Sequence, residues 1–292
     1  MNTLILGGSG KIGRYFNKKN QYRTYRKKKI KNGIYFDLTK HKISKIIKKF
    51  SINKVVFLSA ISDTDFCFKN PNVSHFVNCT KTKSVLKELI KLNIYIIFFS
   101  TEFVFSGNKG NYKENDNTNP INIYGKQKLV IENFLKEKYK NFCILRIAKT
   151  YSDGFRDKTI ITSFLNDLKN KKDKFLAASD QIFSPLYIKD LIKVVNYFLR
   201  KEIKGIYNLG GPKKYSRYAI YKKIMKCVRN YLPNNYKPNL IKTSLDKIKF
   251  IERRPKNVSF DNKKLINNIN FKLTSINTVI KKLVQKYENR VS

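Results

Sequence analysis

The feature that most constrains the fold of this chain is a glycine-rich segment directly after its first apolar residues. Residues 1–6 are mostly apolar, and the next seven read Gly-Gly-Ser-Gly-Lys-Ile-Gly. A strand that enters such a turn and continues into a helix lets the backbone approach a pyrophosphate at the positive end of the helix. We therefore predict a dinucleotide-binding turn that uses Gly7, Gly10, Lys11, Ile12 and Gly13.

Short apolar or β-branched runs alternate with longer amphipathic segments over the first half of the chain. This alternation is typical of a parallel sheet covered by helices. We expect an α/β protein with a Rossmann-type, doubly wound parallel sheet. The expected strands are residues 4–6, 22–25, 34–36, 55–58, 95–99, 142–147 and 205–209.

Beyond residue 151 the alternation loosens, which indicates a smaller, mostly helical C-terminal lobe. Helices are expected near residues 160–168 and 188–198. The nucleotide-binding domain is predicted at 1–150 with 186–210 returning to it, and the substrate-binding lobe at 151–185 and 211–292. The second lobe should pack over the carboxyl edge of the sheet, where open α/β sheets bind ligands.

The 292 residues carry a formal net charge of +42, which would favour a nucleic-acid partner if it were concentrated in one patch. The basic residues are mostly lysine and are spread along the chain, so no nucleic-acid partner is expected. No apolar run approaches the roughly 20 residues that span a bilayer, and the N-terminal run lacks a basic leader. We expect a cytoplasmic protein without a membrane partner.

The cysteines and histidines do not suggest a metal site. The four cysteines are far apart and form no Cys-x-x-Cys, and the two histidines lie outside any cluster with ligand spacing. No metal is therefore predicted, and the cysteines are expected to be reduced thiols.

A tyrosine and a lysine four residues apart form the main candidate for chemistry. Tyr124 and Lys128 would lie on one face of a helix, so that the phenol and the ammonium project into the same cleft. A phenol has an ordinary pKa near 10, and a nearby cation lowers that pKa by favouring the phenolate. The pair is suited to proton transfer to a carbonyl oxygen.

The end of the second expected strand bears on the choice of cofactor. An acidic residue at this place commonly binds the ribose hydroxyls of NAD, whereas an arginine accommodates the additional 2′-phosphate of NADP. Residues 22–28 contain no acid and include Arg26. NADPH is therefore the expected cofactor, with NADH as the alternative.

Several motifs, taken in order, resemble those of extended short-chain dehydrogenase/reductases, and more narrowly of the dTDP-4-dehydrorhamnose reductase family. The resemblance covers nearly the full length. It rests on Gly7-x-x-Gly10-x-x-Gly13, Ser62-Asp63-Thr64-Asp65, Asn78, Ser100-Thr101-Glu102-Phe103-Val104-Phe105-Ser106-Gly107, Tyr112-x-Glu114, Pro120-x-Asn122-x-Tyr124-Gly125-x-x-Lys128, Leu145-Arg146, Asp180-Gln181-x-x-Ser184-Pro185-x-Tyr187-x-x-Asp190 and Arg254-Pro255-x-Asn257-x-Ser259-x-Asp261.

The resemblance implies a role for each catalytic candidate. Tyr124 would protonate the C4 carbonyl oxygen of a nucleotide-linked sugar while hydride arrives from the nicotinamide. Lys128 would bind the nicotinamide ribose and lower the pKa of the phenol. Thr101 would hydrogen-bond the same oxygen, with Ser100 as the alternative, because adjacent side chains on a strand point to opposite faces. Asn78 either assists a proton relay or is an ordinary helix residue.

The resemblance also implies further contacts to the ligands. Asp37 and Leu38 match the place where such folds contact adenine, and Ala60 would flank the cofactor. The positions that match the family's substrate contacts are Ser62, Glu102, Phe103, Lys149, Gln181 and Ser184.

Two departures from the family pattern concern the substrate. Glu102 and Phe103 stand where the family commonly has Asp and Tyr, and Lys149 lies near the place of a family tryptophan, although this chain has no tryptophan. A point charge there replaces an apolar platform for a pyranose and could meet a phosphate or a carboxylate. The sugar could therefore differ from that of the family.

Three hypotheses follow for the activity. The leading one is an NADPH-dependent reductase of a nucleotide-linked 4-keto-6-deoxysugar that serves polysaccharide synthesis. The second is a sugar-nucleotide epimerase or dehydratase that keeps NAD tightly bound, and the third is a non-catalytic, NAD(P)-binding regulatory subunit. The expected partner is a nucleotide-sugar substrate, and the sequence leaves open whether the chain forms a homodimer.

Overall fold

A seven-stranded parallel sheet forms the centre of the larger lobe. The computed structural model describes residues 1–291, apart from the side chains of Arg156 and of residues 288–291. The strand order is β11-β6-β5-β4-β1-β2-β3, and every pairing in this sheet is parallel. The predicted Rossmann-type fold is confirmed. The strands are β1 (Asn2–Leu6), β2 (Gln21–Tyr25), β3 (Ile34–Tyr35), β4 (Ile52–Phe57), β5 (Tyr95–Thr101), β6 (Phe142–Ile147) and β11 (Gly205–Leu209).

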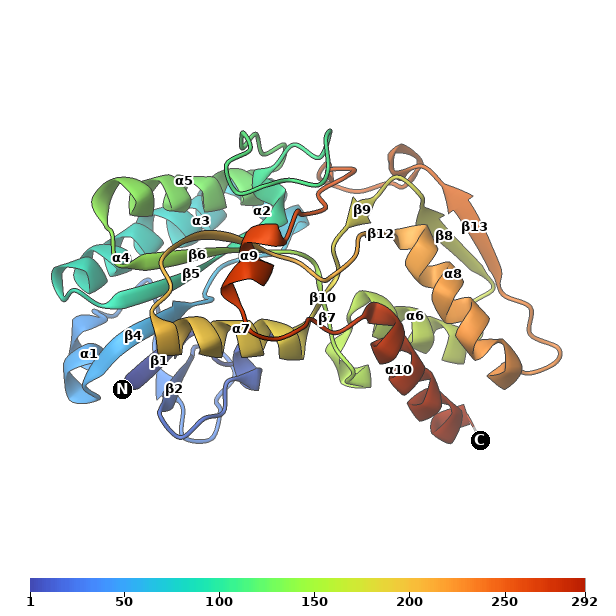
Figure 1. Cartoon of the computed structure of the whole chain (residues 1–292), viewed down its shortest axis with the longest axis horizontal. Coiled ribbons are helices and arrows are strands. Elements are labelled where there is room, and N and C mark those ends of the chain that lie inside the picture. Colours follow the sequence, from blue (N-terminus) through green and yellow to red (C-terminus); the bar gives the residue numbers. More distant parts are fainter. Residues whose placement is uncertain (292) are drawn as a thin grey trace.

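Helices cover both faces of this sheet because its strands are apolar on both sides. In β1, Leu4 and Leu6 pack toward α1, α4 and α5, whereas Ile5 packs toward α7 and α9. Figure 1 shows α4 and α5 above the sheet and α7 below it. These helices are α1 (Ser44–Lys49), α4 (Thr82–Lys91), α5 (Ile123–Lys138), α7 (Ile188–Lys201) and α9 (Lys263–Asn268).

Shorter elements connect the strands at the carboxyl edge of the sheet. A π-helix, η2 (Phe76–Lys81), runs directly into α4, and it is preceded by α2 (Thr64–Lys69) and α3 (Pro71–His75). The side chain of Asp63 accepts a hydrogen bond from the Phe66 backbone and caps α2. The 3₁₀ turns are η1 (Gly13–Tyr15), η3 (Glu102–Val104), η4 (Phe155–Asp157), η5 (Arg229–Tyr231) and η6 (Leu245–Lys247).

The smaller lobe has its own apolar core, formed mainly by α6 (Ile160–Lys169), α8 (Arg217–Val228) and α10 (Ile276–Val291). Its short strands are β7 (Thr150–Tyr151), β9 (Ile182–Phe183), β10 (Leu186–Tyr187) and β12 (Tyr215–Ser216). A longer parallel pair, β8 (Lys174–Ala178) with β13 (Asn239–Thr243), was not predicted. The expectation of a mostly helical lobe therefore missed a two-stranded sheet.

The chain passes more than once between the two lobes. Strand β11 pairs with β6 in the central sheet, and α7 packs beneath that sheet. Leu265 of α9 is also buried in this core, and Figure 1 places α9 near the middle of the molecule. Part of the predicted segment 211–292 thus contacts the nucleotide-binding side. The exact division into domains stays a prediction.

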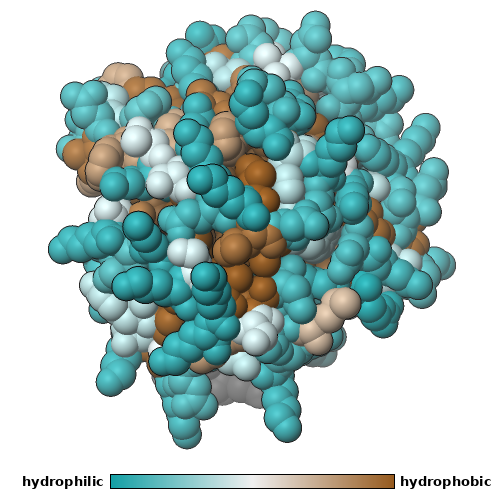
Figure 2. Space-filling model, turned by 90° about the vertical axis from the view of Figure 1, so that its left-hand side faces the viewer, coloured by the Kyte–Doolittle hydropathy of each residue, from teal (hydrophilic) through white to brown (hydrophobic). Residues whose placement is uncertain are grey.

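Hydrophilic side chains cover most of the face at the α1 end of the molecule. Figure 2 shows this face, on which the most prominent apolar area is a central strip and smaller apolar areas lie among the hydrophilic side chains. Within residues 1–291 no helix has the length and the apolar character needed to cross a bilayer.

Candidate functional site

The glycine turn after β1 is tightly packed. A Cβ on Gly13 would lie 2.3 Å from the Gly7 carbonyl oxygen and 2.6 Å from Gly8 Cα, so only glycine fits there. Gly7 has a φ of +88°, a backbone conformation that favours glycine. The turn therefore depends on glycine for its shape.

The helix expected after this turn is much shorter than predicted. It is the single 3₁₀ turn η1, because Phe16 is already extended and the polar residues 17–20 lead straight into β2. The backbone N–H groups of Lys11 and Ile12 bind no acceptor within residues 1–291. They can therefore donate to an anion, although the long helix dipole of the usual fold is missing.

The turn is held from the opposite lobe. Arg14 forms an ion pair with Asp157 of η4, and Tyr15 donates a hydrogen bond of 2.6 Å to the other carboxylate oxygen. Asp157 is buried. These contacts tie η1 to the substrate-side lobe.

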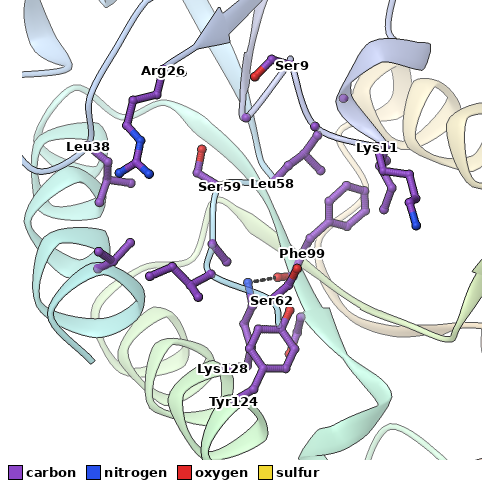
Figure 3. Close-up of a pocket in the computed structure, with 18 of the residues that line it drawn as sticks. Ser9, Lys11, Arg26, Leu38, Leu58, Ser59, Ser62, Phe99, Tyr124 and Lys128 are labelled. Carbon is purple, nitrogen blue, oxygen red and sulfur yellow. Dashed lines mark hydrogen bonds between the residues drawn. The ribbon is translucent and has the colours of Figure 1, made fainter. Parts of the chain in front are cut away.

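A cavity of about 400 Å³ extends from the glycine turn to the start of α5. Figure 3 shows Ser9 and Lys11 near one end of it and Tyr124 and Lys128 near the other. The predicted ligand contacts that line it are Gly7, Gly10, Lys11, Ile12, Gly13, Arg26, Leu38, Ala60, Ser62, Tyr124 and Lys128. Residues from four strand ends and one helix thus share a single cavity.

The end of the cavity next to β2 is lined by the cation Arg26 and by no acid, although Arg26 is near enough to Asp37 to help lower the pKa of that carboxyl. The Arg26 guanidinium points into it beside Leu38 (Figure 3). Asp37, which was predicted to contact the cofactor, does not line the cavity. Its Oδ1 accepts hydrogen bonds from the Thr39 backbone (2.8 Å) and hydroxyl (2.6 Å), and the hydroxyl bond lowers the pKa of Asp37. This carboxylate shapes a turn.

The cavity also includes residues that sequence reasoning missed. Ser59 and Ile61 follow β4, and Thr39 follows the predicted adenine contact. Ser59 lies so close to the turn that a Cβ on Gly7 would be 3.0 Å from its backbone nitrogen. The end of the apolar run at residue 58 was the available signal for this contact.

Tyr124 and Lys128 lie together at the first turns of α5. The Asn122 side chain caps this helix by accepting from the Gly125 N–H at 2.8 Å. Lys128 Nζ donates to the Phe99 carbonyl oxygen at 2.7 Å and lies 5.8 Å from the centre of the Tyr124 ring. The dashed line in Figure 3 marks the bond to Phe99. The predicted common face of the helix is therefore present.

The acid–base properties of this pair differ from the prediction. Burial lowers the pKa of Lys128 to about 8, against the opposing effect of Glu132. Burial raises the pKa of Tyr124 well above its usual value of 10. The predicted lowering by Lys128 is not seen, because the shift comes mainly from the loss of hydration around the buried phenol. Tyr124 is protonated at neutral pH.

The two adjacent hydroxyls at the end of β5 have different partners. Ser100 Oγ donates to Glu132 Oε1 at 2.5 Å and is almost fully buried. Thr101 Oγ1 accepts from the Phe103 N–H at 3.3 Å. The Ser100 hydroxyl lines the cavity but is committed to Glu132, whereas Thr101 is buried and does not line the cavity. Its role stays a prediction.

Asn78 has a structural role in this arrangement. Its side chain accepts from the Ile61 N–H at 2.8 Å and donates to the Ile61 carbonyl and to Gln127 Oε1, both at 2.8 Å. It therefore fixes the loop after β4 against α5. Of the two interpretations, the ordinary hydrogen-bonded residue fits these contacts.

Other predicted substrate contacts lie outside the cavity. Burial raises the pKa of Glu102, and burial lowers the pKa of its neighbour Lys149. The Phe103 carbonyl oxygen packs against Gly125, where a Cβ would lie 2.2 Å from it. Gln181 accepts from Arg217 Nε at 2.8 Å, and Ser184 Oγ accepts from the Phe260 N–H at 3.1 Å. Gln181 thus holds the start of α8, whereas Ser184 holds Phe260, which packs with Phe105 and Tyr112.

No metal site emerges from the part of the chain that the structure describes. Within it, no three His, Cys, Asp or Glu side chains gather in a way that could hold an ion. The cysteines among these residues form no disulfide.

Comparison with known proteins places the chain in a family. The model of the RmlD substrate binding domain family matches residues 1–289. The dTDP-4-dehydrorhamnose reductase of Aggregatibacter actinomycetemcomitans is 29% identical over 213 residues, which are 69% of this chain and 68% of that protein. Methionine adenosyltransferase 2 subunit beta of Bos taurus is 25% identical over 232 residues, 75% of this chain and 69% of that protein.

A solved structure has the same fold. The dTDP-4-dehydrorhamnose reductase of Bacillus anthracis, in complex with NADP, superimposes with a TM-score of 0.83 and is 22% identical, covering 98% of this chain and all of that one. The glycine turn, the Tyr124–Lys128 pair and a family match over nearly every residue agree with one another. The protein belongs to the RmlD substrate binding domain family.

Proposed function

We propose that this protein is an NADPH-dependent reductase of the 4-keto group of a nucleotide-linked 4-keto-6-deoxysugar, with Tyr124 as the proton donor. The observation that carries the proposal is the single cavity that joins the glycine turn to Tyr124 and Lys128. A reductase needs this arrangement, because the hydride donor and the proton donor must meet at one carbonyl group.

The residues along the cavity suit a dinucleotide. The free N–H groups of Lys11 and Ile12 can donate to a pyrophosphate, and the Gly10 backbone leaves room for its approach. Arg26, with no acid beside it in the cavity, supports binding of the 2′-phosphate. The NADP in the Bacillus anthracis structure supports the same choice.

The reaction adds a hydride to the carbonyl carbon and a proton to its oxygen. When bound, NADPH supplies the hydride and is oxidised to NADP⁺. Tyr124, whose raised pKa keeps it protonated, can donate its phenolic proton to the oxygen as negative charge develops there. The Lys128 ammonium lies beside the phenol and stabilises the phenolate that is left. Thr101 can donate its hydroxyl to the same oxygen.

The test is the Tyr124→Phe variant, assayed by the decrease in NADPH absorbance with dTDP-4-dehydrorhamnose. Loss of the proton donor should lower kcat by roughly a hundredfold or more, while NADPH binding stays within a few-fold. Tyr35→Phe is the matched control, since Tyr35 is 52% exposed and lies outside the cavity. Normal turnover by Tyr124→Phe would rule out this role, and absence of turnover by the wild type would rule out this substrate.

A second candidate function is regulation of a partner enzyme. It is favoured by the similarity to methionine adenosyltransferase 2 subunit beta, which by its name is one subunit of a larger enzyme. This alternative predicts NADPH binding without turnover, together with a change in methionine adenosyltransferase activity on mixing. The presence of Tyr124 and Lys128 in one cavity favours the reductase.

A further inference from the structure

A buried ion pair lies one turn along α5 from Lys128. The Glu132 side chain is fully buried and Arg146 is only 3% exposed. Arg146 Nη2 donates to Glu132 Oε2 at 2.7 Å, and its Nε lies 3.1 Å from both carboxylate oxygens. Ser100 Oγ donates to the same carboxylate at 2.5 Å. Glu132 therefore connects α5 to the ends of β5 and β6.

Lys128, the lysine of the site, lies on the preceding turn of α5. Positions 128 and 132 share one face of the helix, and both side chains reach β5 at adjacent residues, Phe99 and Ser100. The two contacts reinforce each other: if Glu132 lost Ser100 and Arg146, α5 could slide along the strand and carry Lys128 away from the Phe99 carbonyl oxygen.

Among the described groups that act on the charge of Lys128, Glu132 is the acid. Lys128 is faced by Tyr124 on its own helix, by Cys67 of α2, by Cys79 of η2 and by the Phe98 ring, whose centre is 4.6 Å from Nζ. Burial raises the pKa of Tyr124, Cys67 and Cys79, so these groups are neutral at pH 7. Burial disfavours the Lys128 ammonium, and Glu132 favours it.

We propose that Glu132 is a positioning residue for the site: its buried carboxylate fixes the Lys128 turn of α5 onto β5 and β6 and places a negative charge on the helix face that carries Lys128. Arg146 secures the carboxylate from the other side. Its Nη1 donates to the Glu114 carbonyl oxygen at 3.0 Å, and its guanidinium lies over the Phe105 ring. A mere structural ion pair would hold the helix without affecting the charge of Lys128.

The direct test measures the protonation of Lys128 and does not require turnover. In protein labelled with ¹³C at the lysine ε-carbon, the NMR signal that titrates near pH 8 and disappears in Lys128→Arg belongs to Lys128. In Glu132→Gln the titration midpoint of Lys128 should fall by about one pH unit, since Glu132 favours the Lys128 ammonium and a neighbouring opposite charge shifts a pKa by roughly 1–3 units. Glu137→Gln is the matched control, because Glu137 is an exposed acid of the same helix.

Ser100→Ala separates charge from anchoring, because it removes one bond to Glu132 and leaves the carboxylate. In Ser100→Ala the titration midpoint of Lys128 should stay within a few tenths of a pH unit of the wild-type value. An unchanged midpoint in Glu132→Gln overturns the proposal, as does an equal fall in Glu137→Gln.

Glu132→Gln leaves Arg146 unpaired in the interior, which can prevent folding. The double variant Glu132→Gln/Arg146→Gln removes both charges and is used in that case. Arg146 contacts the Glu114 carbonyl oxygen and the Phe105 ring and is not among the groups that shift the pKa of Lys128, so the midpoint should still fall below the wild-type value. A midpoint at or above it overturns the proposal.

The catalytic importance of Glu132 rests on the proposed function, and it has its own readout. If the protein reduces the sugar, the alkaline limb of its kcat–pH profile should move to lower pH in Glu132→Gln by the same amount as the NMR midpoint. If the Lys128 midpoint falls as expected in Glu132→Gln but the wild-type protein shows no turnover, the reductase is refuted and the role of Glu132 stands. A shifted midpoint with an unmoved alkaline limb refutes the link between Lys128 charge and turnover.

Discussion

The glycine turn permits one prediction in which folding and cofactor binding respond to different residues. A Cβ added at Gly13 meets only backbone atoms, the nearest at 2.3 Å, so the turn must move by about 0.7 Å to reach the 3.0 Å that real Cβ atoms respect. A Cβ at Gly10 lies 3.2 Å from the Gly7 carbonyl oxygen and needs little adjustment. Gly13→Ala should therefore destabilise the free protein, and Gly10→Ala should not.

The cost of Gly13→Ala follows from the overpacking. Forcing extra atoms into a packed site costs about 1–3 kcal/mol, which for a chain of this size lowers Tm by roughly 3–10 °C. Gly10→Ala should keep Tm within about 2 °C, because its contact is nearly tolerated. Its Cβ would occupy the space that the cofactor's pyrophosphate needs, so NADPH affinity should fall by roughly tenfold or more.

The assay is differential scanning fluorimetry of both variants, first without and then with NADPH. Wild-type Tm should rise with NADPH because the ligand binds the native state. Gly10→Ala should start at the wild-type Tm and lose this rise. Equal destabilisation by the two substitutions would refute the account of the packing, and a full NADPH-dependent rise in Gly10→Ala would refute the placement of the pyrophosphate.

Two further outcomes follow from single side chains. Arg26→Ala should raise the KM for NADPH by roughly 10–100-fold and change the KM for NADH less than about threefold, since only NADPH carries the 2′-phosphate. Equal effects on the two cofactors would contradict the assignment of Arg26 to the 2′-phosphate. Burial raises the pKa of Glu102 from 4.5 to about 8, so the folded protein holds a proton there that the unfolded chain releases. The free energy of unfolding should therefore fall as pH rises between these two pKa values. Urea unfolding at several pH values measures this dependence, and it should be flatter in Glu102→Gln than in the wild type. An equally steep decline in Glu102→Gln would exclude Glu102 as the source.

Much of the fold could be predicted because its signals are local. The strands of the central sheet are continuous apolar runs, and the turn after β1 has glycine where a side chain would collide with backbone. The Tyr124–Lys128 pair was also predictable, since helical spacing alone puts the two residues on one face. These features depend on a few neighbouring residues.

The features that were missed depend on distant or competing contacts. Strand β13 has no buried residue, and its partner β8 lies far away in the sequence, so no local pattern reports that the two pair. Asp37 has the right residue type in the right place, but Thr39 satisfies its carboxylate locally. The pKa of Tyr124 was expected to be lowered by Lys128, whereas burial, which helical spacing does not report, raises it.

The contacts of Asp157 with Arg14 and Tyr15 have a consequence for engineering this protein. The nucleotide-binding turn is held in place by a side chain from a loop of the other lobe. A chimera that exchanges residues 151–185 for those of a relative, in order to change the sugar, would also exchange the anchor of the nucleotide turn. A grafted lobe must therefore bring an acid to position 157, or the recipient turn must be redesigned with it.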